Sequence, residues 1–197
     1  QAKKAGIKPI IGCEIYVATG SRFDKHKRPG GGWGNNHLIL LAQNSTGYKN
    51  LMKLVTAGYL EGFYYRPRID KELLREYNEG LICLSGCLKG EVPEKMLNGD
   101  YEGARNAAIE YSEIFGDRYF LEIQNHGIPE EEANIQNMKK LSSDLGLPLV
   151  CTNDAHYCKQ SHSEAHDIHI CLGTGKERSD PNRLRYATPE FYFKTQD

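Results

Sequence analysis

The side chains best suited to chemistry in this sequence lie in or just after short apolar runs. Cys87 follows the run GLICLS, while Asp154 and His156 follow the run LPLVCT. Glu14 lies inside the run PIIGCEIYVA, where burial of an unpaired carboxylate would be costly, so a functional role is favoured. Carboxylate, thiolate and imidazole groups bind divalent cations, and a mixed set of them favours zinc, manganese or iron over magnesium or calcium. The pattern therefore indicates a metal site.

Most of these residues also have an interpretation without a metal. The pair Asp154-x-His156 is compatible with a turn closed by the aspartate side chain, and Cys87 is compatible with an inert thiol. His37 is compatible with a polar strand start, and His126 with a cap on the helix that follows it. On spacing alone these alternatives stay open.

Nucleophilic catalysis has weaker support than metal binding. The tripeptide Ser85-Gly86-Cys87 together with His156 would suit a thiol hydrolase, yet nothing else in the sequence supplies an oxyanion site. The GxSxG, GxxxxGK(S/T) and strand-linked GxGxxG patterns are absent. Further histidines and cysteines gather near the C-terminal end, at Cys158, His162, His166, His169 and Cys171. We interpret that stretch as an exposed helix rather than a second site.

Apolar runs of strand length alternate with segments of helical periodicity, and these elements must position the candidate residues. The runs cover residues 9–18, 37–42, 80–85, 119–124 and 147–152, and the helical segments cover residues 47–60, 70–77, 90–97, 100–115 and 129–145. Near-continuous apolar strands alternating with helices predict an α/β fold, with a parallel sheet or barrel covered by helices. The carboxyl ends of parallel strands meet at one face, which would gather the candidate side chains there.

The composition is that of a globular protein with balanced charge. The 197 residues include 25 Lys+Arg and 26 Asp+Glu, for a formal net charge of −1. No apolar run approaches the roughly 20 residues of a membrane-spanning helix, and no signal peptide is visible. The charge balance gives no basic footprint, so contact with nucleic acid would be local or made by other parts of a larger protein. The six cysteines contain no CxxC pair, which argues against a zinc knuckle.

Seven segments of the chain, in order and over nearly its whole length, resemble one known family. They are GIKPIIGCEIYVA, NNHLILLAQNSTGYKNLMKLV, EGFYYRPRID, GLICLSGCLKGEVP, FLEIQNHGIPEE, TNDAHY and DPNRLRYATPEFYFK. The family that they resemble is the PHP (polymerase and histidinol phosphatase) domain at the N-terminus of bacterial DNA polymerase III alpha subunits. Segments such as GYKNLMKLV and EGFYYRPRID are similar to this polymerase branch rather than to PHP phosphoesterases in general.

This resemblance implies a distorted, TIM-like (β/α)7 barrel with up to three metal ions at the C-terminal face of its strands. It implies that five of the nine family ligands are present, namely Glu14, His37, Cys87, Asp154 and His156. The implied metals are zinc or manganese, with iron as a further option. His126 is implied to lie beside the site without being a ligand.

The other four family ligands belong to a His-x-His segment with a nearby Asp and to an Asp-His segment, and this sequence holds neither. The chain also starts without Met, on residues that are typical of a helix end capped by Gly6. We therefore expect a fragment. Residues 1–172 would form an incomplete barrel that lacks its first strands, and residues 173–197 would be an exit segment leading toward a polymerase core.

The resemblance further implies a function for the larger protein. It would be a DNA-directed DNA polymerase, a cytoplasmic nucleotidyltransferase that uses magnesium and acts on primer-template DNA and deoxynucleoside triphosphates. A sliding clamp and a proofreading subunit would be its partners, with no membrane contact. The PHP domain would bind metals and support 3′–5′ exonuclease proofreading, and the fragment alone would be inactive. Two alternatives stay open: a stand-alone PHP phosphoesterase, and a metal-free PHP domain with a structural role.

Overall fold

A six-stranded sheet is the centre of the computed structural model, which describes residues 1–26 and 34–195. The strands are β1 (Gly12–Ala18), β2 (Asn35–Ala42), β3 (Arg68–Ile69), β4 (Leu81–Leu84), β5 (Tyr119–Ile123) and β6 (Leu149–Cys151). Their order across the sheet is β3-β1-β2-β4-β5-β6. All but β3 were expected from the apolar runs. The two residues of β3 are too few to produce a periodic signal.

Strand β2 departs from the all-parallel sheet expected from the sequence. It pairs antiparallel with both of its neighbours, β1 and β4, whereas the pairs β1–β3, β4–β5 and β5–β6 are parallel. The expectation was wrong here because the spacing of apolar residues is the same for a strand running in either direction. Antiparallel neighbours also need no helical crossover between them. As a result, β2 begins at the edge where β1 ends, with His37 opposite Tyr16.

Helices α1 to α5 lie within a few residues of the predicted segments. The helices are α1 (Ser45–Leu60), α2 (Lys71–Tyr77), α3 (Glu91–Leu97), α4 (Tyr101–Phe115), α5 (Pro129–Leu145) and α6 (Ser163–Thr174), with short 3-10 turns η1 (Ala2–Ala5), η2 (Gly116–Arg118) and η3 (Gln160–His162). The side chains of Asn44, Asp70 and Asp100 cap α1, α2 and α4 by accepting a backbone N–H from the first turn. These caps explain where the three helices begin.

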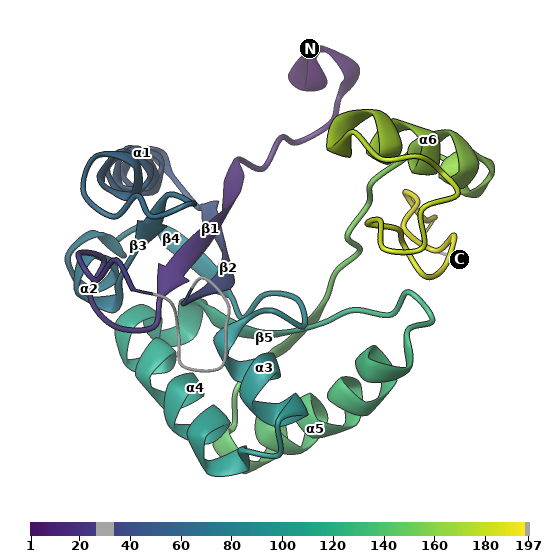
Figure 1. Ribbon diagram of the computed structural model, residues 1–197. Helices are drawn as coiled ribbons and strands as arrows, with labels where there is room; N and C mark the ends of the chain where they lie inside the picture. Colours follow the sequence, from purple (N-terminus) through teal and green to yellow (C-terminus); the bar gives the residue numbers. More distant parts are fainter. Residues whose placement is uncertain (27–33, 196–197) are drawn as a thin grey trace.

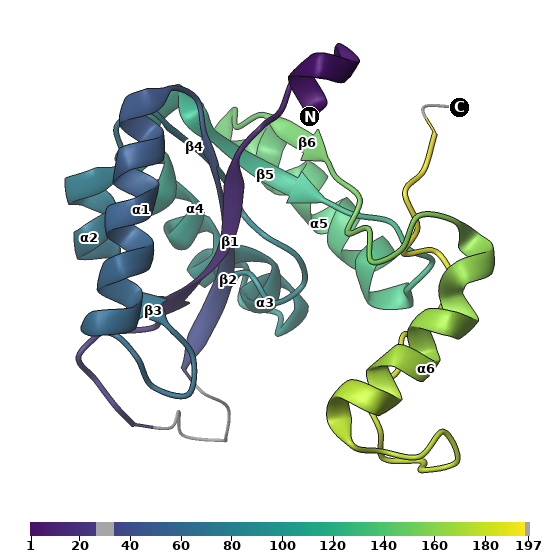
Figure 2. The ribbon, with the colours of Figure 1, turned by 90° about the horizontal axis from the view of Figure 1, so that it is seen from above.

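The helices divide into two groups around the sheet. In Figure 1, α1, α2, α4, α3 and α5 follow one another around the outside of the curved sheet, and α6 with the C-terminal segment lies across from them. The turned view in Figure 2 shows the same separation of α6 from α1 and α2. The open side of the sheet therefore faces α6 and the C-terminal segment.

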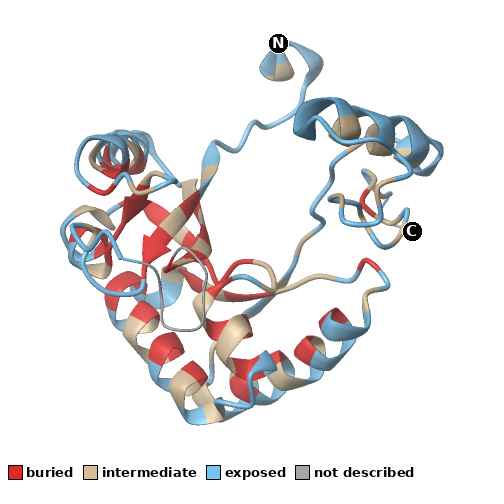
Figure 3. Ribbon diagram, in the orientation of Figure 1, coloured by how far each residue is buried: buried red, intermediate tan, exposed pale blue. Residues whose placement is uncertain are grey.

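The hydrophobic core lies between the sheet and the first group of helices. Buried positions concentrate on the strands and on the helix faces turned toward them (Figure 3). Leu40 and Leu81 from the sheet and Leu54 and Leu74 from the helices are fully buried in one cluster. Each such leucine contributes roughly 1.5–3 kcal/mol to folding. Helix α6 contributes no buried residue, so polar and ring contacts must hold it in place.

Membrane insertion of a helix finds no support in the described ranges 1–26 and 34–195. No helix there combines the length and the apolar character that crossing a bilayer requires.

Candidate metal centre

The five predicted metal donors line a single pocket of about 400 Å³ at one edge of the sheet. Glu14 comes from β1 and His37 from β2, Cys87 follows β4, and Asp154 and His156 follow β6. The strand ends thus bring together side chains that are far apart in the sequence. His37 takes part because β2 is antiparallel and starts where its neighbour ends.

Within this pocket, Glu14, His37 and Cys87 form one group. The Nδ1 atom of His37 lies 3.0 Å from Oε1 of Glu14 and 3.7 Å from Sγ of Cys87. Hydrogen bonds to Cys87 and to Glu14 raise the pKa of His37 to about 9. The same hydrogen bond with His37 lowers the pKa of Glu14. A carboxylate and a thiol therefore stabilise the imidazole in its protonated form.

Asp154 and His156 form a second group in the same pocket. The Oδ2 atom of Asp154 lies 3.2 Å from Nε2 of His156, which in turn lies 3.1 Å from the hydroxyl oxygen of Tyr186. Although His37 contacts both Glu14 and Cys87, no three histidine, cysteine or acidic side chains in residues 1–26 and 34–195 are arranged so that they could together hold a metal ion. The donors thus share a pocket and have a chemistry suited to zinc, manganese or iron, but they form two separate partial groups.

A buried carboxylate, Glu122 on β5, ties together the strand ends that carry the donors. Its Oε2 atom accepts the backbone N–H of Gly86 at 3.0 Å, next to Cys87. Its other oxygen accepts hydrogen bonds from the Thr152 hydroxyl and from the Gln124 side chain. Burial raises the pKa of Glu122, and these hydrogen bonds act against that rise. Glu122 therefore holds the segments that follow β4 and β6 against the end of β5.

The sequence interpretation missed Glu122, although a signal for it exists. Like Glu14, it is a lone carboxylate inside an apolar strand. It also missed Lys89, Arg185 and Tyr186, which line the same pocket. Two exposed cations and a half-buried tyrosine have no distinctive spacing in the sequence, so only the fold could identify them as lining this pocket.

His126 lies fully buried beside the pocket and supports Asp154. The backbone N–H of Asp154 donates to Nε2 of His126 at 3.3 Å, so Nε2 is an acceptor and the ring proton resides on Nδ1. That Nδ1–H donates to Oε1 of Glu131 at 2.7 Å. The ring also stacks on Phe191, with centroids 4.3 Å apart and planes 5° apart. The two ring nitrogens are both occupied by these bonds.

The six cysteines form no disulfide bond, and one of them lies in the donor pocket. All six are free thiols. Cys83 is fully buried in the core, where burial raises the pKa of its thiol well above the ordinary value. Cys87 is half-buried and is the one among the six that lines the donor pocket together with His37.

Known proteins similar to this chain agree with its fold, and the sequences of several relatives match it over its whole length. The sequence model of the PHP domain matches residues 1–126. The chain is 49% identical over 197 residues to DNA polymerase III subunit alpha of Borreliella burgdorferi, a match that covers 100% of this chain and 17% of the relative. It is 51% identical over 193 residues to the protein of the same name from Treponema pallidum, covering 98% of this chain and 16% of that relative.

A third relative matches the whole chain as well. The DNA polymerase III subunit alpha of Thermus aquaticus is 46% identical over 197 residues, which is 100% of this chain and 16% of that protein. The chain thus spans 16–17% of the length of these relatives. From the family match, together with the helix-covered α/β sheet that bears it, we conclude that this chain belongs to the PHP domain family.

Proposed function

We propose that the chain is the PHP part of a DNA polymerase III alpha subunit, so that the whole protein is a DNA-directed DNA polymerase. Support comes from relatives at 46–51% identity that carry this name and match the entire chain, including residues beyond the PHP match. That coverage argues against a stand-alone PHP phosphoesterase. The partners of the whole protein would be primer-template DNA, deoxynucleoside triphosphates, magnesium, a sliding clamp and a proofreading subunit.

The reading frame that surrounds this sequence tests the proposal directly. A polymerase-sized frame continuing beyond residue 197 is the expected result. A stop codon soon after that residue would favour the phosphoesterase instead.

The proposed fold of the domain is an incomplete, TIM-like (β/α)7 barrel over residues 1–172, followed by an exit segment over residues 173–197. The curved sheet with helices on its outer side supports this arrangement (Figure 1). So does the meeting of five donors at the ends of the strands. In the described part of the sheet, β3 and β6 are the edge strands.

The proposed role of the site is metal-dependent cleavage of a phosphodiester, as in 3′–5′ exonuclease proofreading. Glu14, His37, Cys87, Asp154 and His156 would hold zinc, manganese or iron. When bound, such ions activate water and neutralise charge on the phosphoryl oxygens. The observation that carries this proposal is the meeting of all five donors in one pocket.

The residues around the donors have complementary tasks in this proposal. Glu122 and His126 hold the backbone next to Cys87 and at Asp154, and so orient those donors. Lys89 and Arg185 line the pocket as exposed cations and would attract a phosphate group.

Metal analysis of the complete protein tests the site. We expect bound zinc, manganese or iron in the purified protein and at least a tenfold loss of affinity in Asp154→Ala, the low end for loss of a ligand or its support. Asp117→Ala removes an exposed carboxylate from η2, away from the pocket, and should bind metal normally. An unmodified protein without metal would refute the metal centre and favour the structural role.

A further inference from the structure

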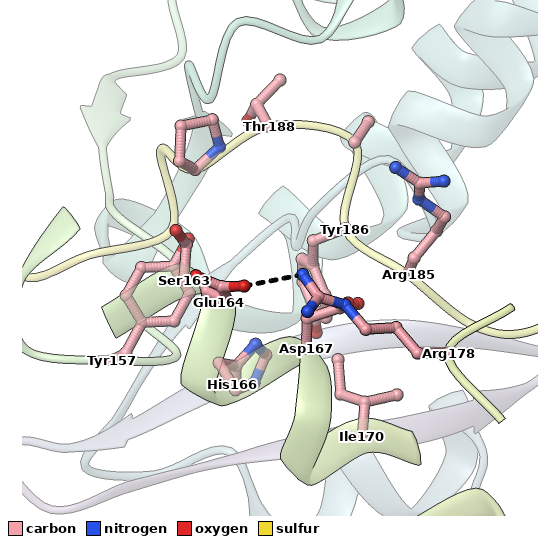
Figure 4. Close-up of a pocket in the computed structure, with 12 residues that line it drawn as sticks. Tyr157, Ser163, Glu164, His166, Asp167, Ile170, Arg178, Arg185, Tyr186 and Thr188 are labelled. Carbon is pink, nitrogen blue, oxygen red and sulfur yellow. Dashed lines mark ion pairs between the residues drawn. The ribbon is translucent and has the colours of Figure 1, made fainter. Parts of the chain in front are cut away.

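A second hollow, of about 280 Å³, lies between α6 and the C-terminal segment. Figure 4 shows the side chains around it, with Tyr157 on one side, Arg185 on the other, and His166 and Ile170 projecting from α6. Pockets for drug-sized molecules measure roughly 300–1,000 Å³, so this one suits a single flat ring system rather than a long ligand.

The hollow adjoins the donor pocket through two shared residues. Arg185 and Tyr186 line both spaces. Tyr186 stands between them, with its hydroxyl 3.1 Å from Nε2 of the predicted ligand His156 and its ring 5.2 Å from that of His166. A molecule seated in the hollow can therefore reach the metal donors by passing Arg185.

The charges lining the hollow are neutralised except at one position. Arg178 pairs with Glu164 at 3.0 Å and lies 3.4 Å from Asp167. Arg183 binds both carboxylate oxygens of Asp167, at 2.5 and 2.9 Å. Within the described ranges, Arg185 makes no hydrogen bond or ion pair. A guanidinium left without a partner at this junction is suited to a phosphate group, which it can bind in a bidentate manner.

The remaining walls are aromatic and apolar. Tyr157 and His166 are in ring contact at 5.1 Å, and Ile170 lies further along the same helix. The hydroxyl of Tyr157 is buried and has no hydrogen-bond partner among the residues that the structure describes. A buried polar group without a partner marks a place where a hydrogen-bonding ligand would be favourable. Aromatic walls with polar atoms at their edges suit a nucleobase, which stacks through its faces and forms hydrogen bonds through its edges.

We propose that this hollow, between α6 and the C-terminal segment, binds the nucleobase of the terminal nucleotide, with Arg185 on its phosphate at the entrance to the donor pocket. The inference rests on the proposed phosphodiester cleavage and names the part of the substrate that the second hollow recognises. The nucleobase lies against Tyr157, His166 and Ile170, and the 5′-phosphate extends past Tyr186 toward the donors.

Isothermal titration calorimetry of 2′-deoxyadenosine 5′-monophosphate binding to the 197-residue chain, with and without manganese, tests the proposal. The comparison ligand is 2-deoxyribose 5-phosphate, which lacks the nucleobase. We expect the nucleotide to bind about tenfold more tightly, since stacking of one base on aromatic side chains contributes 1–3 kcal/mol. This advantage of the nucleobase should persist without manganese. Equal affinities for the two ligands would overturn the proposal.

Two variants on α6 provide a matched pair. Ile170→Trp fills the hollow and should abolish the tenfold advantage, whereas Ile168→Trp, on an exposed position outside the hollow, should preserve it. Arg185→Gln should weaken both ligands alike. Equal nucleotide binding by the two tryptophan variants would overturn the proposal.

One further measurement uses the unmodified chain, so its result does not depend on whether a variant folds. Intermolecular NOEs from the adenine H2 or H8 proton should reach the methyl groups of Ile170 and not those of Ile168, and the reverse pattern would overturn the proposal. These outcomes are separate from those for the metal centre. Loss of metal with retained base recognition would refute the proposed cleavage alone, while metal binding without base recognition would refute the hollow's role.

Discussion

The backbone N–H of Asp154 donates a hydrogen bond to the buried ring of His126 at 3.3 Å, and that ring in turn donates to Glu131. These hydrogen bonds connect the first turn of α5, through the segment after β5, to the segment after β6. Glu131 also accepts the backbone N–H of His126 at 2.6 Å, which fixes the start of this chain. A predicted metal donor is thus positioned by a buried ring and by Glu131, which itself lines the donor pocket.

Replacing His126 tests this chain of bonds. His126→Ala should lower the free energy of unfolding by about 3 kcal/mol, because it removes a buried stacked ring and leaves Glu131 without its partner. Glu131→Gln keeps an acceptor for the ring and should cost only about 1 kcal/mol. Urea unfolding followed by circular dichroism measures both. Equal urea midpoints for His126→Ala and the unmodified protein would show that these hydrogen bonds do not contribute to stability.

Glu122 provides a second test of how the strand ends are held. Glu122→Ala leaves the buried N–H of Gly86 without an acceptor and frees Thr152, so we expect a loss of about 2–3 kcal/mol. Glu122→Gln retains an acceptor and should lose less. Chemical denaturation compares the two with Glu113→Gln on the exposed side of α4, which should unfold like the unmodified chain. Identical stability in Glu122→Ala would mean that the strand ends hold together without it.

Much of the fold could be predicted because periodicity and caps are local signals. The bounds of α5 follow from Pro129 at its start and Gly146, in the left-handed region with φ 67°, at its end. The direction of β2 could not be predicted, since pairing direction depends on the rest of the sheet. The two-residue strand β3 was missed because so short a segment has no pattern of its own.

The candidate site also has residues that local sequence signals suggested and residues that only the fold reveals. Glu14 was a candidate as a carboxylate inside an apolar strand, and Asp154 and His156 were candidates by residue type after a strand. The same reasoning left Cys87 open as an inert thiol until the family resemblance favoured it. The structure places all four in one pocket. His37 lies near the start of a strand, so it too was favoured only by the family resemblance. The supporting roles of Glu122 and His126 depend on contacts between distant segments, and these no spacing rule reveals.

The pH dependence of stability should reveal the ion pairs of Glu110. Lys71 and Arg75 on α2 contact this carboxylate on α4 at 2.6 and 2.5 Å. Burial alone would raise the pKa of Glu110, but the hydrogen bonds from Lys71 and Arg75 outweigh it and lower the pKa. The folded state therefore binds this proton less tightly than the unfolded state, whose pKa is near 4.3. Stability from Glu110 is present above that value and is lost as the pH falls through the folded pKa.

The variant Glu110→Gln isolates this contribution. At pH 7 it should destabilise the chain by no more than about 1 kcal/mol, because the pair is partly exposed to solvent. The difference from the unmodified chain should vanish as the pH falls below 4. Thermal unfolding at several pH values measures it, with Glu113→Gln as the control on the same helix. A difference that stays constant from pH 7 to pH 3 would contradict the assignment to these ion pairs.

Two helical glycines should respond to alanine in opposite directions. A Cβ atom at Gly47, in the first turn of α1, would lie 1.8 Å from the carbonyl oxygen of Gly80. Gly47→Ala must therefore push α1 away from the segment before β4, and we expect a loss of about 2 kcal/mol or more. A Cβ atom at Gly173 in α6 would meet nothing within 4 Å. Gly173→Ala should stabilise its helix by about 0.5 kcal/mol, since alanine restricts the unfolded chain.

Amide hydrogen exchange separates these two effects by location. Gly47→Ala should accelerate exchange in α1 and in β4, the strand that α1 contacts in the sheet. Gly173→Ala should slow exchange in α6 alone. Because α6 buries no residue, its exchange reports its own helix stability rather than that of the core. If Gly47→Ala left exchange in α1 unchanged, the close approach of Gly47 to Gly80 would not be needed for packing this helix on the sheet.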